Sequence, residues 1–182
     1  LLNSTEETSY NSFIGTWQLD PAEDFCNGII EYFENSKEIP KQRADDDVKN
    51  MHQMYVYDTT NPYVKFLNNQ ILPTLYQEYC EKYENFPMVR EVNSTVVKIQ
   101  RYDPPDDAYK QWHCERINLD PMNITRHLVW MIYLNDVNDG GETEFYYQKL
   151  KIKPKAGKML VWTPDWIHTH RGVSSQIGRA HV

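Results

Sequence analysis

Residues 128–145 read LVWMIYLNDVNDGGETEF, and this stretch decides the fold class. Together with the preceding His127, its first part is an apolar run that ends at Leu134 and is short enough for a buried strand. A turn ending in two glycines follows at 135–141, and residues 143–147 predict a second strand. The stretch is therefore expected to form two strands joined by a turn.

Further strands are expected on both sides of this stretch. Upstream, residues 95–102 read TVVKIQRY and are rich in β-branched side chains, and the turn 103–107 follows them. Downstream, 150–152 and 159–162 predict two more strands, with a tight turn at 154–157 between them. Short antiparallel strands thus account for the second half of the chain.

The first half predicts helices. Residues 1–19 show no clear period and are expected to form an arm or a first edge strand. Asp20 should cap a helix that has Pro21 at its first position and Glu23 completing a capping box. The apolar stripe of this helix is Phe25, Ile29 and Phe33.

A charged loop is expected at 34–47, and a second helix starts at Asn61-Pro62. Pro73 should kink that helix or split it in two, because proline removes a backbone donor. Its apolar face is formed by Val64, Leu67, Ile71, Leu75 and Tyr79.

Helices followed by short strands predict an α+β fold with a β-sandwich or jelly-roll half. The length of 182 residues fits a single domain, 1–182. Within it, residues 20–86 are expected to give mainly helical support, and 94–176 the jelly-roll core that carries the site.

Composition excludes several classes of protein. The formal charge of −7, with no basic cluster to meet phosphates, argues against nucleic-acid binding. No apolar run approaches the length of a membrane span. Three cysteines without a CxxC spacing indicate neither a disulfide framework nor a zinc knuckle, so a reducing, cytoplasmic location is expected.

His113 and Glu115 carry the most specific chemical signal. Residues two apart on an extended backbone point to the same face, so this imidazole and carboxylate would aim together and Cys114 away from them. A third ligand must come from elsewhere, and His168 and His170 are both candidates. Two histidines and one carboxylate on one face leave positions open, which is the arrangement of non-haem Fe(II) oxygenases.

The second half of the chain resembles the prolyl-4-hydroxylase-like branch of the 2-oxoglutarate/Fe(II) dioxygenase superfamily. Residues 133–145 are similar to the family signature YLND…GGET.F, and IKPKAGKMLVW at 152–162 is similar to the strand pair that follows it. The sequence His170-Arg171-Gly172 stands where the family places its distal histidine. The resemblance covers residues 96–175 and implies a double-stranded β-helix, or jelly roll, with supporting helices.

The resemblance also implies roles for individual residues. His113, Glu115 and His170 would bind Fe(II), and Tyr133 would bind the distal carboxylate of 2-oxoglutarate. Tyr102 stands where many members place a further pocket tyrosine. For both tyrosines the alternative is a side chain of the apolar core.

Two features depart from the family pattern. The usual HxD is here HxE, which we interpret as a variant with a shifted carboxylate. Arg179, nine residues after His170, could pair with 2-oxoglutarate, as the family's basic residue does. However, IGRAHV at 177–182 is also what one frame of a common sequencing adapter encodes, so this tail is suspected to be non-native and the jelly roll truncated.

The expected function is hydroxylation of a substrate C–H coupled to oxidative decarboxylation of 2-oxoglutarate, with O2 consumed and ascorbate as a candidate reductant. Peptidyl proline is the first substrate to test, and another protein side chain or a small molecule stays open. The alternatives are a cupin-like metalloenzyme without 2-oxoglutarate and a non-catalytic jelly-roll binding protein.

Overall fold

The computed structural model describes residues 2–3, 9–37, 41–86, 94–116, 121–176 and 178–182. The chain divides into two units, one formed by Leu1–Met54 with Ile99–Val182 and the other by Tyr55–Lys98. The expectation of one domain stays a prediction, and each unit is described by itself.

One layer of the first unit is an extended antiparallel sheet. Its first part has the order β1(Leu2–Asn3), β3(Ile14–Leu19), β10(Lys158–Trp162), β7(Val129–Ile132), and β2(Ser9–Asn11) also pairs with β3. Its second part has the order β12(Arg179–His181), β6(Val97–Tyr102), β5(Asn50–Val56), β4(Gln42–Asp45). Val182 and Ile132 exchange backbone hydrogen bonds of 2.8 and 3.0 Å, so the two parts form one continuous layer.

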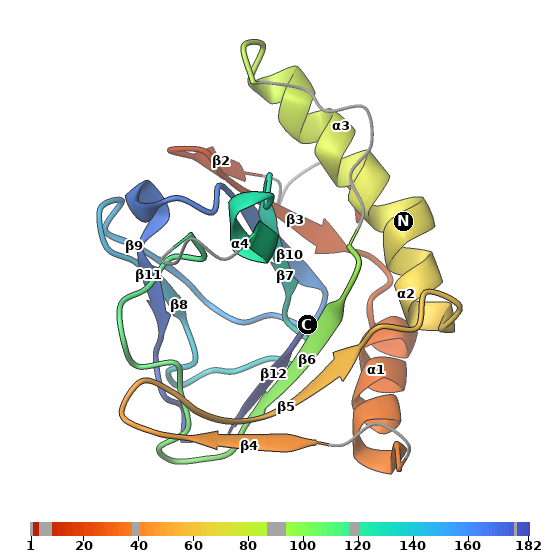
Figure 1. The fold of residues 1–182 in the computed structure, drawn as a ribbon, viewed down its shortest axis with the longest axis vertical. Helices are drawn as coiled ribbons and strands as arrows, with labels where there is room; N and C mark the ends of the chain where they lie inside the picture. The colour runs from red at the N-terminus through yellow and green to blue at the C-terminus, as the bar shows by residue number, and fades with distance from the viewer. Residues whose placement is uncertain (1, 4–8, 38–40, 87–93, 117–120, 177) are drawn as a thin grey trace. The chain divides into compact units, whose positions relative to one another are not determined.

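A three-stranded sheet faces this layer, in the order β11(His170–Gly172), β8(Thr143–Phe145), β9(Leu150–Ile152) (Figure 1). Along the chain, β6 and β7 lie in the first layer, β8 and β9 in the second, β10 in the first, β11 in the second and β12 in the first again. The chain thus crosses repeatedly between two facing antiparallel sheets, as in a jelly roll. Buried apolar side chains fill the space between the layers: Ile14, Met131, Tyr133, Leu160 and Trp162 from one, Phe145 and Ile152 from the other. The predicted jelly-roll fold is confirmed.

The first helix differs in its start from the prediction. The helix α1 spans Glu23–Asn35, and its N-cap is Ala22, whose side chain makes no capping hydrogen bond. The predicted capping box of Asp20 and Glu23 is therefore wrong, because the N-cap lies two residues later than expected. Ile29 and Phe33 are buried as predicted.

Two other N-terminal predictions need correction. Residues 42–45, expected in a loop, form β4, whose mostly exposed side chains hide the strand from an apolar pattern. The strand β5, which pairs with β4, was also missed. The arm is not a simple edge, because β3 pairs with β10 on one side and with β1 and β2 on the other.

The predicted turn at 154–157 joins strands of different layers rather than neighbours, since β9 pairs with β8 and β10 with β3 and β7. Gly157 has a φ of 78°, and a β-carbon there would collide with the side chain of Ala22. This crossover therefore requires glycine. Two short helices complete the unit, α4(Pro121–Ile124) and the 3-10 turn η2(Trp166–His168).

In the second unit a helical run begins at Asn61, whose side-chain oxygen accepts hydrogen bonds from the backbone N–H groups of Tyr63 and Val64. The run consists of α2(Pro62–Phe66), a π-helical turn η1(Leu67–Ile71) and α3(Leu72–Lys82). Pro73 lies in the first turn of α3, where the π-helical turn passes into an α-helix. The residues at this junction keep helical dihedral angles, so the predicted split into two helices is not observed there. None of the described helices is long and apolar enough to span a membrane.

The suspected tail takes part in the sheet. β12 pairs with β6, and the backbone N–H of Leu134 donates to Ala180 on its other side at 3.0 Å. The strand β11, which carries His170, is bonded on one side by β8 and on the other by His113. Ile177 lies outside the described residues, and the origin of 177–182 stays a prediction.

Candidate metal centre

His113 and His170 face each other across an antiparallel pair. The backbone N–H of His113 donates to His170 at 3.0 Å, and that of His170 donates to His113 at 2.9 Å. Directly opposed residues in such a pair project their side chains on the same face. The two imidazole ring centroids consequently lie 4.4 Å apart.

Glu115 joins them two residues after His113, at a bend of the backbone. Its Oε1 is 3.6 Å from Nε2 of His170. One ligand atom from each of the three residues lies within 4.8 Å of the other two. The structure thus brings together the three residues that the sequence predicts as metal ligands.

Backbone carbonyls fix which nitrogen each imidazole presents. Nδ1 of His113 lies 2.9 Å from the carbonyl oxygen of Gln111, and Nδ1 of His170 lies 2.9 Å from that of His168. A proton held on Nδ1 by such a bond leaves the Nε2 lone pair for a metal. Both histidines are therefore oriented as ligands by their own strands.

Aromatic rings enclose the two imidazoles. The Tyr109 ring stacks on His113 with centroids 3.6 Å apart and planes inclined by 10°. Phe145 and Trp162 pack against His170 with centroid separations of 5.5 and 5.0 Å. These rings hold the imidazoles in place and keep water from the buried side of the cluster.

Burial dominates the electrostatics of the cluster. It raises the pKa of Glu115 to about 7, although Arg126 and the Trp162 indole act in the opposite direction. Burial, assisted by His113, lowers the pKa of His170 to about 3. His170 is therefore neutral at physiological pH, which is the form that binds a metal.

The cluster fits a divalent cation. Oε2 of Glu115 is buried and has no hydrogen-bond partner among the described residues. A carboxylate in that position is costly unless a positive charge compensates it. Two neutral imidazoles and one carboxylate are the donor set for Fe(II) with positions left open for co-substrates.

His168, the rival to His170, lies outside the cluster. Its ring is buried, with Nδ1 2.7 Å from Oγ1 of Thr163 and Nε2 2.8 Å from the carbonyl oxygen of Ser12. Both nitrogens are thus committed to other partners. The sequence analysis missed the contribution that His168 does make, which is the carbonyl that orients His170.

The residues expected to bind 2-oxoglutarate lie on adjacent strands of the larger layer. Tyr133 is fully buried, and its hydroxyl oxygen lies 2.6 Å from Oγ1 of Thr143 and 3.2 Å from the carbonyl oxygen of Ile152. Tyr102 is buried on β6. Arg179 pairs through its backbone with Tyr102, and its side chain lies outside what the structure describes.

His181 is a neighbour of both tyrosines that the sequence analysis did not propose. Its ring stacks on Tyr102 with centroids 5.2 Å apart and meets Tyr133 edge-on at 6.4 Å. The suspicion about the tail had excluded this histidine. Strand alternation from Arg179 would have suggested it, because residues 179 and 181 share a face.

Comparisons with known proteins agree with the fold. Residues 97–181 match the family model described as the 2OG-Fe(II) oxygenase superfamily. A viral collagen prolyl hydroxylase from Paramecium bursaria Chlorella virus-1, solved with 2OG, superposes with a TM-score of 0.68 at 20% identity, covering 93% of each chain. No curated protein sequence matches the chain.

Two further solved structures share the fold. A Pseudomonas putida prolyl-4-hydroxylase gives a TM-score of 0.65 at 15% identity and covers 93% of this chain and 89% of its own. A Trichoplax adhaerens prolyl hydroxylase, in complex with a peptide fragment of the hypoxia inducible factor oxygen degradation domain, gives 0.64 at 14% identity. It covers 93% of this chain and 80% of its own.

Proposed function

Because residues 97–181 belong to the 2OG-Fe(II) oxygenase superfamily, as the sequence motifs predicted, we propose that the chain is an Fe(II)- and 2-oxoglutarate-dependent hydroxylase. The observation that carries this proposal is the convergence of His113, Glu115 and His170 within 4.8 Å. These three residues would hold the iron.

When bound, iron and 2-oxoglutarate supply the oxidation, in which O2 is consumed, 2-oxoglutarate becomes succinate and CO2, and a substrate C–H becomes C–OH. The chain supplies the geometry for this chemistry. The carbonyls of Gln111 and His168 keep the Nδ1 protons in place, so Nε2 of both histidines stays available. Glu115 would hold the metal as a carboxylate, and its negative charge would compensate part of the charge of the cation.

We extend the proposal to three residues that would bind 2-oxoglutarate. Tyr133 would turn its hydroxyl, which lies 2.6 Å from Oγ1 of Thr143 between the sheets, toward a carboxylate of 2-oxoglutarate. Tyr102 would line the same interior, and Arg179 would pair with the distal carboxylate. Arg179→Ala tests the role of Arg179. If Arg179 pairs with 2-oxoglutarate, the substitution should lower the affinity for 2-oxoglutarate at least about tenfold and leave the affinity for iron unchanged.

We propose peptidyl proline as the first substrate to test, with ascorbate as the reductant. The proposed location of the protein is the cytoplasm. The support for peptidyl proline is that the structural neighbours are named prolyl hydroxylases, one of them solved with a peptide. With a proline-containing peptide, the amount of succinate formed from 2-oxoglutarate should equal the amount of hydroxyproline formed. Succinate formation without hydroxyproline would point to another substrate.

The decisive experiment is an anaerobic titration of the metal-free protein with Fe(II) and then 2-oxoglutarate. A visible charge-transfer band that needs both additions, and that His113→Ala removes, is the expected result. Iron binding without any effect of 2-oxoglutarate would favour a cupin-like enzyme. Absence of tight iron binding would favour a non-catalytic jelly-roll protein.

A further inference from the structure

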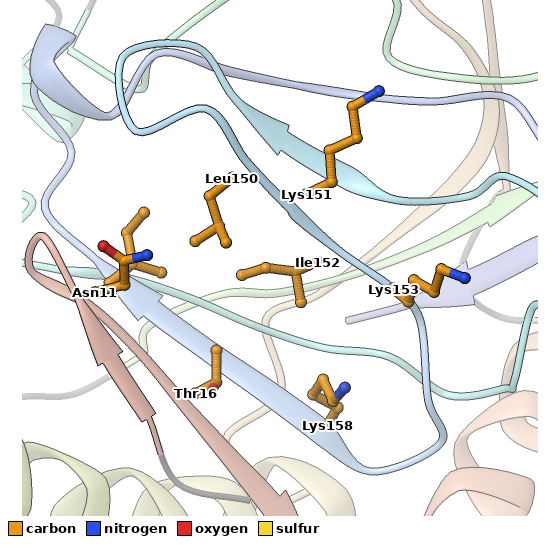
Figure 2. A pocket seen from close by; sticks show the side chains of 8 residues that line it. Asn11, Thr16, Leu150, Lys151, Ile152, Lys153 and Lys158 are labelled. Carbon is orange, nitrogen blue, oxygen red and sulfur yellow. The ribbon is translucent and has the colours of Figure 1, made fainter.

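A cavity of the first unit is lined by residues other than the candidate metal ligands. Its volume is about 340 Å³, and it opens between β9 on one side and β2, β3 and β10 on the other (Figure 2). Known small-molecule sites begin at roughly this size. The cavity therefore has room for one small ligand.

The floor of the cavity is apolar and its ends are polar. Ile14, Leu150 and Ile152 form the floor, and Ile14 and Ile152 belong to the buried core between the sheets. Asn11 lies at one end, and Lys153 and Lys158 lie at the other (Figure 2). A ligand that fills this space would have an apolar body and a negatively charged head.

The surrounding sequence is locally basic in an acidic chain. Five lysines and no acidic residue occur between positions 149 and 158, whereas the whole chain has 26 acidic and 19 basic residues. The sequence analysis saw no basic cluster because apolar and small residues separate these lysines. The fold gathers three of them, Lys151, Lys153 and Lys158, beside one cavity that has no acidic residue in its lining.

Protection of an edge strand accounts for only part of this pattern. Lysines on an exposed edge prevent pairing with other chains. Lys151 fits that role, since its ammonium lies 3.4 Å from Glu144 of the neighbouring strand and it points away from Leu150 and Ile152 (Figure 2). Lys158 does not fit, because β10 is bonded on both sides and its side chain is half-buried.

We propose that this cavity binds a small organic anion, with its carboxylate or phosphate between Lys153 and Lys158 and its aliphatic body on the floor of Ile14, Leu150 and Ile152. Two ammonium groups give charge-assisted hydrogen bonds to one anionic head. The hydroxyl of Thr16 and the amide of Asn11 line the rest of the cavity and serve any polar group at the far end. The site is independent of the proposed hydroxylase activity.

The test is an NMR titration of the backbone amides with hexanoate, hexyl phosphate and hexan-1-ol. We expect both anions to shift Thr16, Leu150 and Ile152 with dissociation constants on the order of 1 mM, as suits ligands of so few atoms. The tighter of the two identifies the preferred head group. The neutral alcohol should bind at least about tenfold more weakly.

Matched variants locate the charge recognition. Lys153→Gln with Lys158→Gln should weaken hexanoate binding about tenfold, while Lys155→Gln, in the same stretch but outside the cavity lining, should not change it. Unchanged chemical shifts elsewhere show that the double variant is folded. Equal binding of hexan-1-ol, equal loss in Lys155→Gln, or no shifts at these amides would each overturn the proposal.

Discussion

Two clusters of the first unit have the same kinds of side chain and differ in what compensates their charge. One is the candidate metal cluster of His113, Glu115 and His170, and the other is formed by His52, Asp103 and Asp107. In each, one ligand atom per residue lies within 4.8 Å of the others. Proximity alone therefore does not distinguish a metal site from a structural one.

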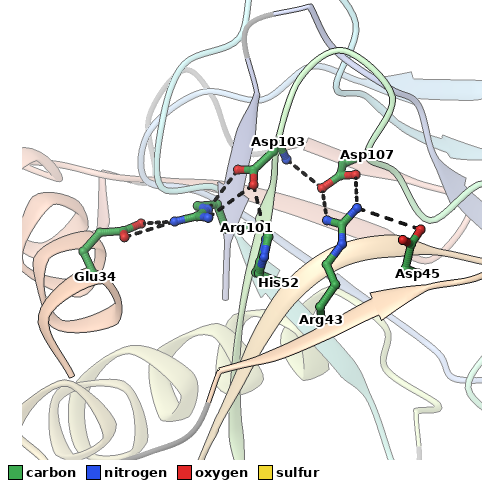
Figure 3. Close-up of polar contacts among 7 residues, drawn as sticks. All are labelled: Glu34, Arg43, Asp45, His52, Arg101, Asp103 and Asp107. Atoms are coloured by element: carbon green, nitrogen blue, oxygen red, sulfur yellow. Dashed lines mark hydrogen bonds and ion pairs between the residues drawn. The ribbon is translucent and has the colours of Figure 1, made fainter. Parts of the chain in front are cut away.

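Arginines neutralise the second cluster (Figure 3). Arg43 makes two hydrogen bonds to Asp107, one of them at 2.9 Å. Arg101 approaches Asp103 at 2.9 Å through Nε and also pairs with Glu34 at 2.8 Å. The backbone N–H of Asp103 donates to Asp107 at 3.0 Å, so the carboxylates already have their partners.

The two buried carboxylates shift in opposite directions. Arg43 is the main cause that lowers the pKa of Asp107, whereas burial raises the pKa of Glu115 to about 7. A carboxylate that remains costly to ionise is one that a cation can stabilise. The two clusters therefore differ in whether the carboxylate has a cationic partner, and the lack of one at Glu115 is what favours it as the candidate metal ligand.

The largest effect is expected from removing a metal ligand. His113→Ala, Glu115→Ala and His170→Ala should each lower Fe(II) affinity more than about a hundredfold, because even supporting residues account for ten- to a hundredfold. Turnover of 2-oxoglutarate should be abolished. Anaerobic calorimetry and succinate assays measure both.

The controls for this prediction come from the comparison itself. Asp103→Asn and His168→Ala should keep iron binding, although His168→Ala loses two partly buried hydrogen bonds and some stability. If Asp103→Asn lowered iron affinity as much as Glu115→Ala does, the second cluster would be a metal site too.

The next effect is the pH dependence of metal binding. The folded-state pKa of Glu115 is raised to about 7, so below that pH a metal must displace a proton from it. Affinity for Co(II), used as an air-stable probe, should fall about tenfold per pH unit below 7 and level off above it. Affinity that stays constant between pH 5.5 and 7 would contradict the elevated pKa.

Much of this site could be predicted from local sequence, and the rest could not. Glu115 follows from strand alternation after His113, and His170 follows from the family motif. Strand alternation alone left both His168 and His170 as candidates. The position of the His168 side chain is known only from the structure, in which it contacts Thr163 and Ser12. The partner of Arg43 lies 64 residues away, which no local pattern encodes.

The fold shows the same limit. Strands with apolar alternation, such as β6, were predicted. The strand β4 was not predicted, because its side chains are mostly exposed and it is held in the sheet by backbone pairing with β5. The sequence signal for the start of the first helix also gave the wrong residue. Asp20 offers the right cap residue at the wrong place, since α1 begins at Glu23.

A smaller effect tests the structural role of the second cluster. Asp107→Asn should lower the free energy of unfolding by about 1–2 kcal/mol, discounted because the Arg43 side chain is 36% exposed. Iron affinity should not change. Urea denaturation at neutral pH measures the loss.

The pH dependence of this loss has a definite sign. The folded pKa of Asp107 lies below its ordinary 3.8, so its contribution is present above that pH and is lost as the pH falls through the folded value. The gap between wild type and Asp107→Asn should therefore close in acid. A gap that widened in acid would show that Arg43 does not stabilise the ionised form.

The stacked ring on His113 gives a still smaller effect. Tyr109→Leu should weaken metal binding about two- to tenfold, the range for an aromatic pair, while Tyr109→Phe keeps the stack and the affinity. Calorimetry with Co(II) measures both variants. Equal losses in the two would assign the effect to the hydroxyl instead.

The smallest effect is predicted for Cys114, the residue between two candidate ligands. Its side chain points to the opposite face if the segment is extended, as the pairing of His113 with His170 indicates. Burial is the main cause that raises the pKa of its thiol, so the thiolate that would bind a metal is disfavoured. Cys114→Ser should therefore change Co(II) affinity by less than about twofold.

Coordination of Co(II) by the Cys114 thiolate would add an intense charge-transfer absorption to the spectrum. That absorption, or a large loss of affinity in Cys114→Ser, would mean that Cys114 faces the metal and that the strand alternation relating His113 to Glu115 does not hold.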